Sequence, residues 1–257
     1  MTRSPWDPAQ YERFRDERSR PFFDLLAMME PCPGGRVVDL GCGTGELTRA
    51  LHDATEAMET VGIDSSETML AKSSAFAGGG LRFELGDIAN VGEQRSFDVV
   101  FSNAALQWVG SHEALFPNLA ALVKPGGQLA VQVPANHDHI SHLAAHAVAR
   151  EEPFRMALDG YVRDVPVREP EWYAEELDRL GFGEQNVRLQ VYVHHLGSRD
   201  DVVEWVKGTL LTDYQKRMPA ALYDRFLARY REVLLPQISE ARPYFYAFKR
   251  ILMWARK

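Results

Sequence analysis

Apolar and polar positions fall into alternating blocks along the first half of the chain, and these blocks predict strands separated by helices. Short runs rich in valine, isoleucine and phenylalanine have the length of buried strands, whereas the stretches between them place apolar residues at helical spacing. Such alternation predicts parallel strands joined by helical crossovers, hence an α/β fold with a doubly wound sheet. The expected strands are 36–41, 58–66, 81–88, 97–106 and 128–134, the expected helices are 46–54, 66–77 and 112–123, and a "KPGG" turn occupies 124–127.

The rhythm changes after Ala135, where about fifty residues precede the next strand pattern, 186–196. A long helical stretch from Arg199 to about Ile238 follows, and then a last strand. Helical pieces of this kind are expected to cap the carboxyl edge of the sheet, where open α/β folds bind ligands. We therefore predict four parts: an N-terminal helical segment (1–34), a core (35–135), a helical cap with a returning strand (136–243) and a final core strand (244–257).

Composition narrows the class of protein. The chain has 257 residues, is 46% apolar and has a formal charge of 29 − 36 = −7, so it can build a sizeable core and offers no basic field for nucleic acid. Its two cysteines, Cys32 and Cys42, suggest neither a disulfide framework nor a zinc ribbon. With no membrane-spanning apolar run and no signal-like N-terminus, we expect a cytoplasmic protein, monomeric or homodimeric, without a membrane or nucleic-acid partner.

The segment "VVDLGCGTGEL" is the strongest candidate for chemistry. Gly41, Gly43 and Gly45 follow a buried strand and open a helix, an arrangement that lets a ligand approach the main chain closely. A dinucleotide fingerprint would need a small residue at Glu46, so a nicotinamide cofactor is disfavoured. Asp39, just before the loop, is a poor neighbour for a pyrophosphate but suits a ligand with a positively charged amino group, such as S-adenosylmethionine.

Two further carboxylates end the next two predicted strands. Asp64 is placed to accept hydrogen bonds from both hydroxyls of a ribose, and Asp87 to accept one from an adenine amino group. Any one of them is more often only a helix cap, but together they predict a cofactor site. We assign to the same site neighbours of these segments and one arginine of the N-terminal segment: Ser65, Met69, Ile88, Asn103 and Arg20.

Four segments in this order, "VVDLGCGTGEL", "VGIDSS", "ELGDI" and "LVKPGGQLAV", resemble the class I S-adenosylmethionine-dependent methyltransferases over about residues 35–135. The resemblance implies a Rossmann-like sheet of seven strands, the last of them antiparallel. "YFYAFKRILMWARK" fits that last strand.

A narrower resemblance, to the trans-aconitate methyltransferases, extends over nearly the whole chain through "WDPAQYERFRDERSRP", "NAALQWVGSHEALFPNL", "VQVPANHDHISHLAAHAVA" and "VVEWVKGT". That family methylates a carboxylate of a small tricarboxylic acid. A carboxylate is ionised at pH 7, so the reaction needs alignment and exclusion of water rather than a general base. We expect Gln107 and Trp108 to face the methyl group and His142 to hydrogen-bond a substrate carboxylate; the substrate-binding candidates are Tyr11, Arg18, Asn136, Trp205 and Lys207.

One departure from the family pattern leaves the substrate open. After "EWVKGT" the family commonly continues Gly-Leu-Arg-Pro, whereas this chain has Leu210, Leu211, Thr212 and Asp213. Lys207, Lys216 and Arg217 can compensate for the missing arginine, or "LLTDY" can line a pocket for a less acidic metabolite; a protein that binds the cofactor without turnover is a third hypothesis.

The histidines of "NHDHISHLAAH" crowd one helical face, but without carboxylate or cysteine ligands at a diagnostic spacing we predict no metal.

Overall fold

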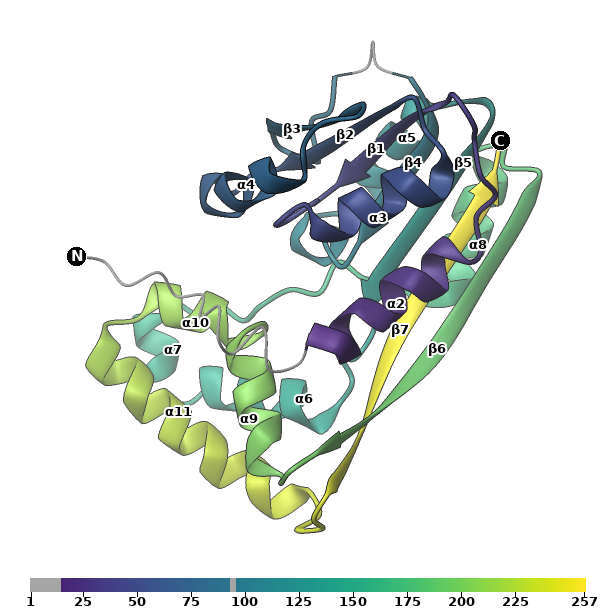
Figure 1. Cartoon of the computed structure of the whole chain (residues 1–257). Coiled ribbons are helices and arrows are strands. Elements are labelled where there is room, and N and C mark those ends of the chain that lie inside the picture. Colours follow the sequence, from purple (N-terminus) through teal and green to yellow (C-terminus); the bar gives the residue numbers. More distant parts are fainter. Residues whose placement is uncertain (1–14, 93–95) are drawn as a thin grey trace. The chain divides into compact units, whose positions relative to one another are not determined.

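The computed structural model describes residues 15–92 and 96–257, and its strands form one seven-stranded sheet (Figure 1). The strands are β1 (Arg36–Leu40), β2 (Glu59–Asp64), β3 (Leu81–Leu85), β4 (Phe97–Asn103), β5 (Val123–Pro134), β6 (Glu184–Leu196) and β7 (Tyr244–Arg256). Their order in the sheet is β3-β2-β1-β4-β5-β7-β6. The neighbouring pairs from β3 to β5 are parallel, whereas β7 is antiparallel to β5. The predicted α/β fold with an antiparallel last strand is confirmed.

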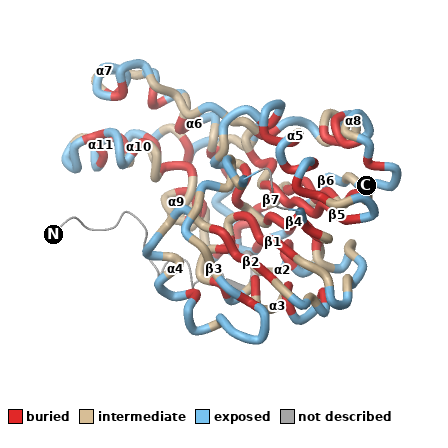
Figure 2. The backbone as a smooth tube through the Cα atoms, turned by 90° about the horizontal axis from the view of Figure 1, so that it is seen from above, coloured by how far each residue is buried: buried red, intermediate tan, exposed pale blue. Residues whose placement is uncertain are grey.

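Helices cover both faces of the sheet: α3 lies in front of it in Figure 1 and α5 behind it, and Figure 2 shows the two on opposite sides of the buried strands. The helices are α2 (Arg15–Leu26), α3 (Glu46–Thr55), α4 (Glu67–Ser73), α5 (His112–Leu122), α6 (Ile140–Ala149), α7 (Phe154–Ala157), α8 (Pro170–Arg179), α9 (Asp200–Lys207), α10 (Leu211–Arg217) and α11 (Ala220–Leu234). Short 3-10 turns span Ser74–Phe76, Leu106–Trp108 and Leu235–Gln237.

The local sequence explains why β1 and its following helix form. Val37 and Val38 are β-branched, favour extended backbone and are fully buried, so both faces of β1 lie inside the protein. The chain then turns through Gly45, which has φ +81° and precedes the first residue of α3. The helix buries one face, which includes Leu51, against the sheet side of the protein.

The chain divides into two compact units, each with its own buried interior. Unit 2 holds β1 to β5 with α3, α4, α5 and α8, and unit 1 holds α6, α7, α9, α10 and α11. The core of unit 1 is apolar and aromatic, with Trp205, Tyr214, Phe226 and Tyr246 among its buried side chains. The described residues of unit 1 are 15–17, Ala135–Val165 and Val191–Lys249; those of unit 2 are 18–92, 96–134, Pro166–Gln190 and Arg250–Lys257.

Two segments differ from the sequence-based expectations. The residues of "KPGG" belong to β5 rather than to a free turn: the pairing with β4 passes from Phe97↔Val123 directly to Val99↔Gln128, so the glycines are accommodated as an irregularity within the strand. The stretch from Arg199 to Ile238 is not one helix but three, α9, α10 and α11, because Gly208 and Pro219 interrupt it.

Close contact between two loops fixes the carboxyl edge of unit 2. Gly41 has φ +87°, and a Cβ on it would lie 2.2 Å from the Cβ of Ala105, which follows β4. Only glycine allows the loop after β1 to approach the segment after β4 this closely. The glycine requirement at this position is therefore both conformational and steric.

We expect Gly41→Ala to destabilise the protein more than Gly34→Ala. Both glycines have positive φ, but a Cβ on Gly34 would meet no described atom within 4 Å. Gly34→Ala should cost about 1–2 kcal/mol for the left-handed backbone alone, and Gly41→Ala about 1–3 kcal/mol more for the overlap with Ala105. Chemical unfolding of the two variants measures the difference, and equal losses would contradict the steric argument.

Candidate active site

Asp39 lies near the carboxyl end of β1 and is 4% exposed. Thr48 of α3 donates its hydroxyl hydrogen to Asp39 Oδ2 at 2.7 Å. Burial raises the pKa of Asp39 to about 7, and the nearby charge of Asp64 adds to the rise against the opposing effect of the Thr48 hydrogen bond. At neutral pH this carboxyl group is poised between its two protonation states, so a positively charged ligand can draw it into the ionised state.

The glycine loop hydrogen-bonds the second predicted carboxylate, Asp64. The backbone N–H of Gly43 donates to Asp64 Oδ2 at 2.9 Å, and the backbone N–H of Ser66 donates to Oδ1 at 2.9 Å. These bonds fix the carboxylate plane at the end of β2, yet each oxygen keeps a lone pair for a further donor. Gly43 itself is open: among the described atoms, a Cβ there would meet only the Met69 methyl, at 3.8 Å.

The remaining residues predicted beside Asp64 and beyond β3 lie nearer the surface. Asp87 is exposed and shaped by its own turn, since its oxygens accept from the Ala89 N–H and from Asn90 Nδ2, each at 2.9 Å. Ser65 is exposed and Ile88 is half-buried. The backbone N–H of Gly86 donates to the carbonyl oxygen of Asp64, which ties this turn to the end of β2.

The segment after β4 contributes two acceptor oxygens that have no hydrogen-bond partner among the described residues. They are the buried Asn103 Oδ1 and Gln107 Oε1, although Gln107 Nε2 donates to the Ala104 carbonyl at 2.7 Å. Ala104 between them has φ +55°, which is unusual for a residue with a Cβ. Buried acceptors normally find donors, so this segment favours a ligand that brings its own. Trp108 is 50% exposed.

Together these groups form one edge of acceptors within unit 2. The carboxyl ends of β1, β2 and β4 bring Asp39, Asp64 and Asn103 to the same side of the sheet, with Gly41 in contact with the segment after β4. This edge matches a ligand that is rich in hydrogen-bond donors and carries a positive charge. A ribose, an amino group and an adenine satisfy that description.

Three predicted residues lie on the N-terminal segment. Arg20 is an exposed residue of α2. Tyr11 and the side chain of Arg18 lie outside the described residues, so their assignments stay predictions.

The predicted substrate residues of unit 1 have structural contacts there. Asn136 is buried, accepts the Lys249 N–H at 3.1 Å and donates to the Tyr246 hydroxyl at 3.4 Å. Trp205 packs in the core beside His194, with ring centroids 4.8 Å apart. Lys207 Nζ lies 2.9 Å from the carboxylate of Glu204 on the same helix. The assignment of these residues to a substrate stays a prediction.

His142 lies half-buried on α6. Burial, followed by the positive neighbourhood of His139, Arg163 and His146, lowers its pKa to about 3. The imidazole is therefore neutral at pH 7 and keeps one N–H donor for a carboxylate.

The segment that departs from the family pattern is partly core. Leu210 and Leu211 are buried in the interior of unit 1, whereas Asp213 faces Arg163, with Arg163 Nε 3.7 Å from Asp213 Oδ2. Arg163, Thr48 and Ala105 were not among the residues expected at the site from the sequence. Thr48 had a local signal, since it follows the glycine loop by one helical turn; Arg163 had none, because fifty residues separate it from Asp213.

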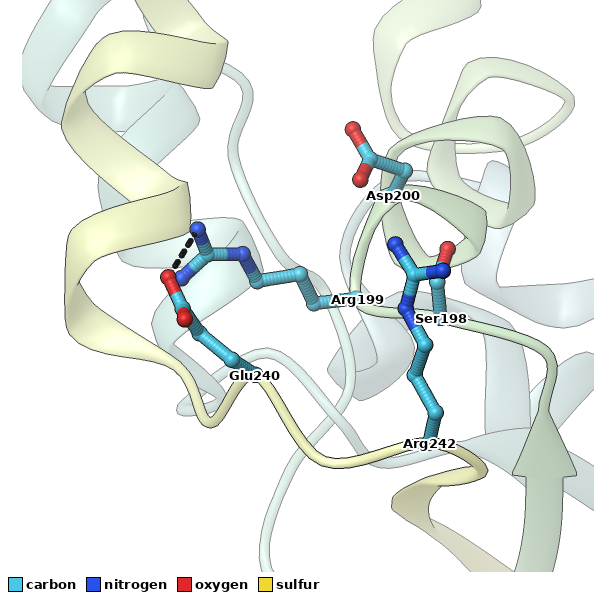
Figure 3. A pocket seen from close by; sticks show the side chains of 5 residues that line it. All are labelled: Ser198, Arg199, Asp200, Glu240 and Arg242. Carbon is cyan, nitrogen blue, oxygen red and sulfur yellow. Dashed lines mark ion pairs between the residues drawn. The ribbon is translucent and has the colours of Figure 1, made fainter.

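A separate polar pocket of about 250 Å³ lies in unit 1, where α9 begins (Figure 3). Its walls include Arg199 and Glu240, which form an ion pair at 2.6 Å. It contains none of the predicted site residues; the full lining is Ser198, Arg199, Asp200, Glu240 and Arg242.

Within residues 15–92 and 96–257, no three His, Cys, Asp or Glu side chains converge as metal ligands. No helix in that part of the chain has the length and apolar character to cross a bilayer.

Comparison with known proteins identifies the family to which the chain belongs. A profile described as a methyltransferase domain matches residues 37–127. The YcgJ protein of Bacillus subtilis is similar in fold, with a TM-score of 0.60 and 17% identity over 93% of this chain and 98% of that one. The trans-aconitate 2-methyltransferase of Deinococcus radiodurans is 44% identical over 98% of each chain, and that of Variovorax paradoxus is 37% identical over 98% of this chain and 95% of its own. The predicted methyltransferase is thus confirmed, and the chain belongs to the trans-aconitate 2-methyltransferase family.

Proposed function

We propose that the protein transfers a methyl group from S-adenosylmethionine to one carboxylate oxygen of a small polycarboxylic acid such as trans-aconitate. The cofactor is S-adenosylmethionine, which supplies an electrophilic methyl group on a positively charged sulfur. The observation that carries the proposal is the buried Asp39 at the end of β1 beside the glycine loop, with a pKa of about 7. The substrate class follows from the names of relatives that match the chain over nearly its whole length. We place the reaction in the cytoplasm and assign it to a monomer or homodimer acting on a dissolved metabolite.

The residues of unit 2 fit this cofactor. Asp39 pairs with its amino group, and Asp64, already oriented by Gly43, accepts from the ribose hydroxyls. Asn103 Oδ1, which lacks a partner among the described residues, accepts from the same amino group. Met69, whose methyl would lie 3.8 Å from a Cβ on Gly43, packs against the nucleoside. The other residues that we assign to the cofactor site are Gly41, Gly45, Ser65, Asp87, Ile88 and Arg20.

The acceptor side needs no general base, because a carboxylate is already ionised at neutral pH. Its needs are orientation and a site without water. Gln107 and Trp108 orient the reacting carboxyl group, and the neutral His142 donates one hydrogen bond to the substrate. The other residues to which we assign a role in substrate binding are Asn136, Trp205, Lys207, Tyr11 and Arg18.

We expect labelled methyl transfer from S-adenosylmethionine to a panel of di- and tricarboxylic acids to give a labelled monoester, detected by mass spectrometry. Neutral esters and phenols in the same panel should give none. Gln107→Ala should lower kcat/KM about tenfold to hundredfold, since it removes the second N–H of Gln107 Nε2, which is proposed to donate to the reacting carboxylate, while the first N–H donates to the Ala104 carbonyl. Label appearing only in uncharged acceptors would refute the polyacid substrate.

Cofactor binding tests the assigned carboxylates. Asp39→Ala and Asp64→Ala should each weaken the binding of S-adenosylhomocysteine at least about tenfold, because each removes a charge-assisted partner from a polar group that binding buries. Asp53→Ala is the matched control, since Asp53 is an exposed aspartate of α3 in the same unit. Calorimetry on folded variants gives the answer; unchanged affinity in both variants would remove these residues from the site.

The pKa of Asp39 predicts a pH dependence of binding. A cationic amino group binds the ionised carboxylate, and ionisation is lost below about pH 7. Affinity for S-adenosylhomocysteine should therefore fall as pH decreases from 7.5 to 5.5, approaching about tenfold per pH unit. In Asp39→Asn the affinity should be weaker and nearly independent of pH. A wild-type profile as flat as that of the variant would contradict a titrating Asp39.

The stability of the folded protein should change with pH in the opposite direction to the affinity for S-adenosylhomocysteine. The folded pKa of Asp39 lies above the ordinary value, so the folded protein binds this proton more tightly than the unfolded chain does. Its contribution to stability is present at low pH and is lost as pH rises from about 4 to 7. The unfolding temperature of Asp39→Asn should therefore exceed that of the wild type at pH 8, by about 2–4 °C for each kcal/mol of relieved charge burial, and the difference should shrink toward pH 5. A constant difference would show that Asp39 is not strained when ionised.

A further inference from the structure

His112 is a fully buried histidine of unit 2 to which the proposed function gives no role. It is the first residue of α5, and its ring joins two segments that are distant in the sequence. Its Nε2 lies 3.0 Å from the carbonyl oxygen of Leu106, and its Nδ1 lies 2.6 Å from the hydroxyl oxygen of Tyr173 on α8. The 3-10 turn Leu106–Trp108 contains Gln107. His112 therefore connects α8 to the turn that carries a proposed acceptor-binding residue.

The partners of His112 define which of its nitrogens carries hydrogen. A carbonyl oxygen can only accept, so Nε2 donates to Leu106, and Nδ1 accepts the hydrogen of the Tyr173 hydroxyl. The Tyr173 oxygen in turn accepts the backbone N–H of Arg168 at 3.1 Å. Burial lowers the pKa of His112, while the charges of Glu113 and Arg168 act on it in opposite directions. The imidazole is thus neutral at pH 7, and both of its nitrogens have a partner.

The turn that His112 holds follows a strained backbone position. Ala104 has φ +55°, which is unfavourable for a residue with a Cβ, and its carbonyl oxygen accepts from Gln107 Nε2 at 2.7 Å. On one side, the Ala104 N–H donates to the carbonyl oxygen of Gln132 in β5 at 2.9 Å. On the other side, His112 holds the carbonyl group of Leu106. A strained conformation persists only where its surroundings fix it, so an anchor on each side keeps Gln107 in one orientation.

The ring of His112 is itself held in a buried aromatic cluster. Phe116 of the same helix and Tyr173 are both fully buried. Their ring centroids each lie 5.8 Å from that of His112 and 5.1 Å from each other. Because close packing opposes a change of rotamer, the donor nitrogen of His112 has a fixed position. The turn that contains Gln107 therefore has a rigid support.

We propose that His112 is a positioning residue for methyl transfer, which holds the Leu106–Trp108 turn so that the Gln107 amide stays directed at the reacting carboxylate. Tyr173 supports it by fixing the orientation of the imidazole. This inference rests on the proposed function, in which Gln107 orients that carboxylate. Transfer requires alignment of the oxygen with the methyl group, so a small displacement of Gln107 slows the reaction. His112 contributes neither a charge nor a proton to the reaction.

The test compares His112→Asn with His112→Gln in the methylation of acids. Glutamine can place its amide nitrogen where Nε2 lies and donate to Leu106, whereas asparagine is one carbon shorter. We expect His112→Asn to lower kcat about tenfold to hundredfold, with KM for the acid and affinity for S-adenosylhomocysteine within about threefold of wild type. His112→Gln should retain at least about threefold more activity than His112→Asn. Equal losses of kcat in the two variants, or a loss that appears only as a raised KM, overturn the inference.

His52→Asn is the matched control. His52 is also a buried histidine of unit 2 with one hydroxyl and one carbonyl partner, since its ring nitrogens lie 2.8 Å from Thr60 Oγ1 and 2.9 Å from the Gly79 carbonyl oxygen. These partners lie outside the turn of Gln107, so His52→Asn should destabilise the protein and leave kcat unchanged. If it lowers kcat as much as His112→Asn does at an equal loss of unfolding temperature, His112 acts only through stability and the inference is wrong.

A double variant shows whether His112 acts through Gln107. If it does, adding His112→Asn to Gln107→Ala should change kcat less than about twofold, because the group that His112 positions is already absent. Effects on kcat that multiply in the double variant overturn the inference.

The proposed function and this inference fail in different ways. A wild-type enzyme that methylates none of the acids contradicts the proposed function. Hydrogen exchange then decides the inference alone, through the N–H groups of Trp108 and Val109, which donate to carbonyl oxygens of the same turn. Exchange at these positions that is about tenfold or more faster in His112→Asn, and not in His52→Asn, supports the positioning role. Exchange that is unchanged, or equally faster in both variants, overturns it.

Discussion

The candidate cofactor site depends on one buried carboxyl group and on what surrounds it. Asp39 is held by the Thr48 hydroxyl at 2.7 Å, and its strand is paired on both sides, with β2 and with β4. Because β1 cannot shift without breaking two ladders, the carboxyl group has a fixed position. The glycine loop that starts two residues later takes its path from the same strand and hydrogen-bonds Asp64. Backbone pairing in the middle of the sheet thus sets the positions of Asp39 and Asp64, the proposed acceptors for the amino group and the ribose, and the loops orient the Asp64 carboxylate.

The carboxyl edge of unit 2 also has several features that are unfavourable unless a ligand satisfies them. Asp39 has a raised pKa, Asn103 and Gln107 hold buried acceptor oxygens without a partner among the described residues, and Ala104 has a left-handed backbone. Each feature costs stability, and natural proteins tolerate such costs mainly where they serve binding. The parts of β1 and β4 farther from this edge are apolar and closely packed, with Val37, Val38 and Val99 fully buried. Unit 2 therefore combines a closely packed apolar interior with a carboxyl edge whose residues are individually unfavourable.

The location of the candidate residues in unit 2 could be predicted from the sequence because these residues follow their strands directly. Asp39 and Asp64 each lie at or near the end of a run of buried residues, so strand periodicity alone brings them to one edge. In unit 1 the sequence indicated local contacts but not distant ones. Lys207 pairs with Glu204, three residues before it on the same helix, whereas Arg163 meets Asp213 across fifty residues and no local pattern marks it. Helix ends were also hard to predict, since many helices tolerate an internal glycine and the presence of Gly208 alone does not show that α9 ends there.

The place of β7 in the sheet constrains how the chain is assembled during synthesis. β7 lies between β5 and β6, although it follows both along the chain. β6 leaves the ribosome about fifty residues before β7 does, and until β7 emerges it has no neighbour through which to join the sheet. During that interval the nascent chain exposes the edges of both β5 and β6, which are ready to pair with other strands. Completion of the sheet is thus a late, long-range event, which must wait until the last strand of the chain has been synthesised.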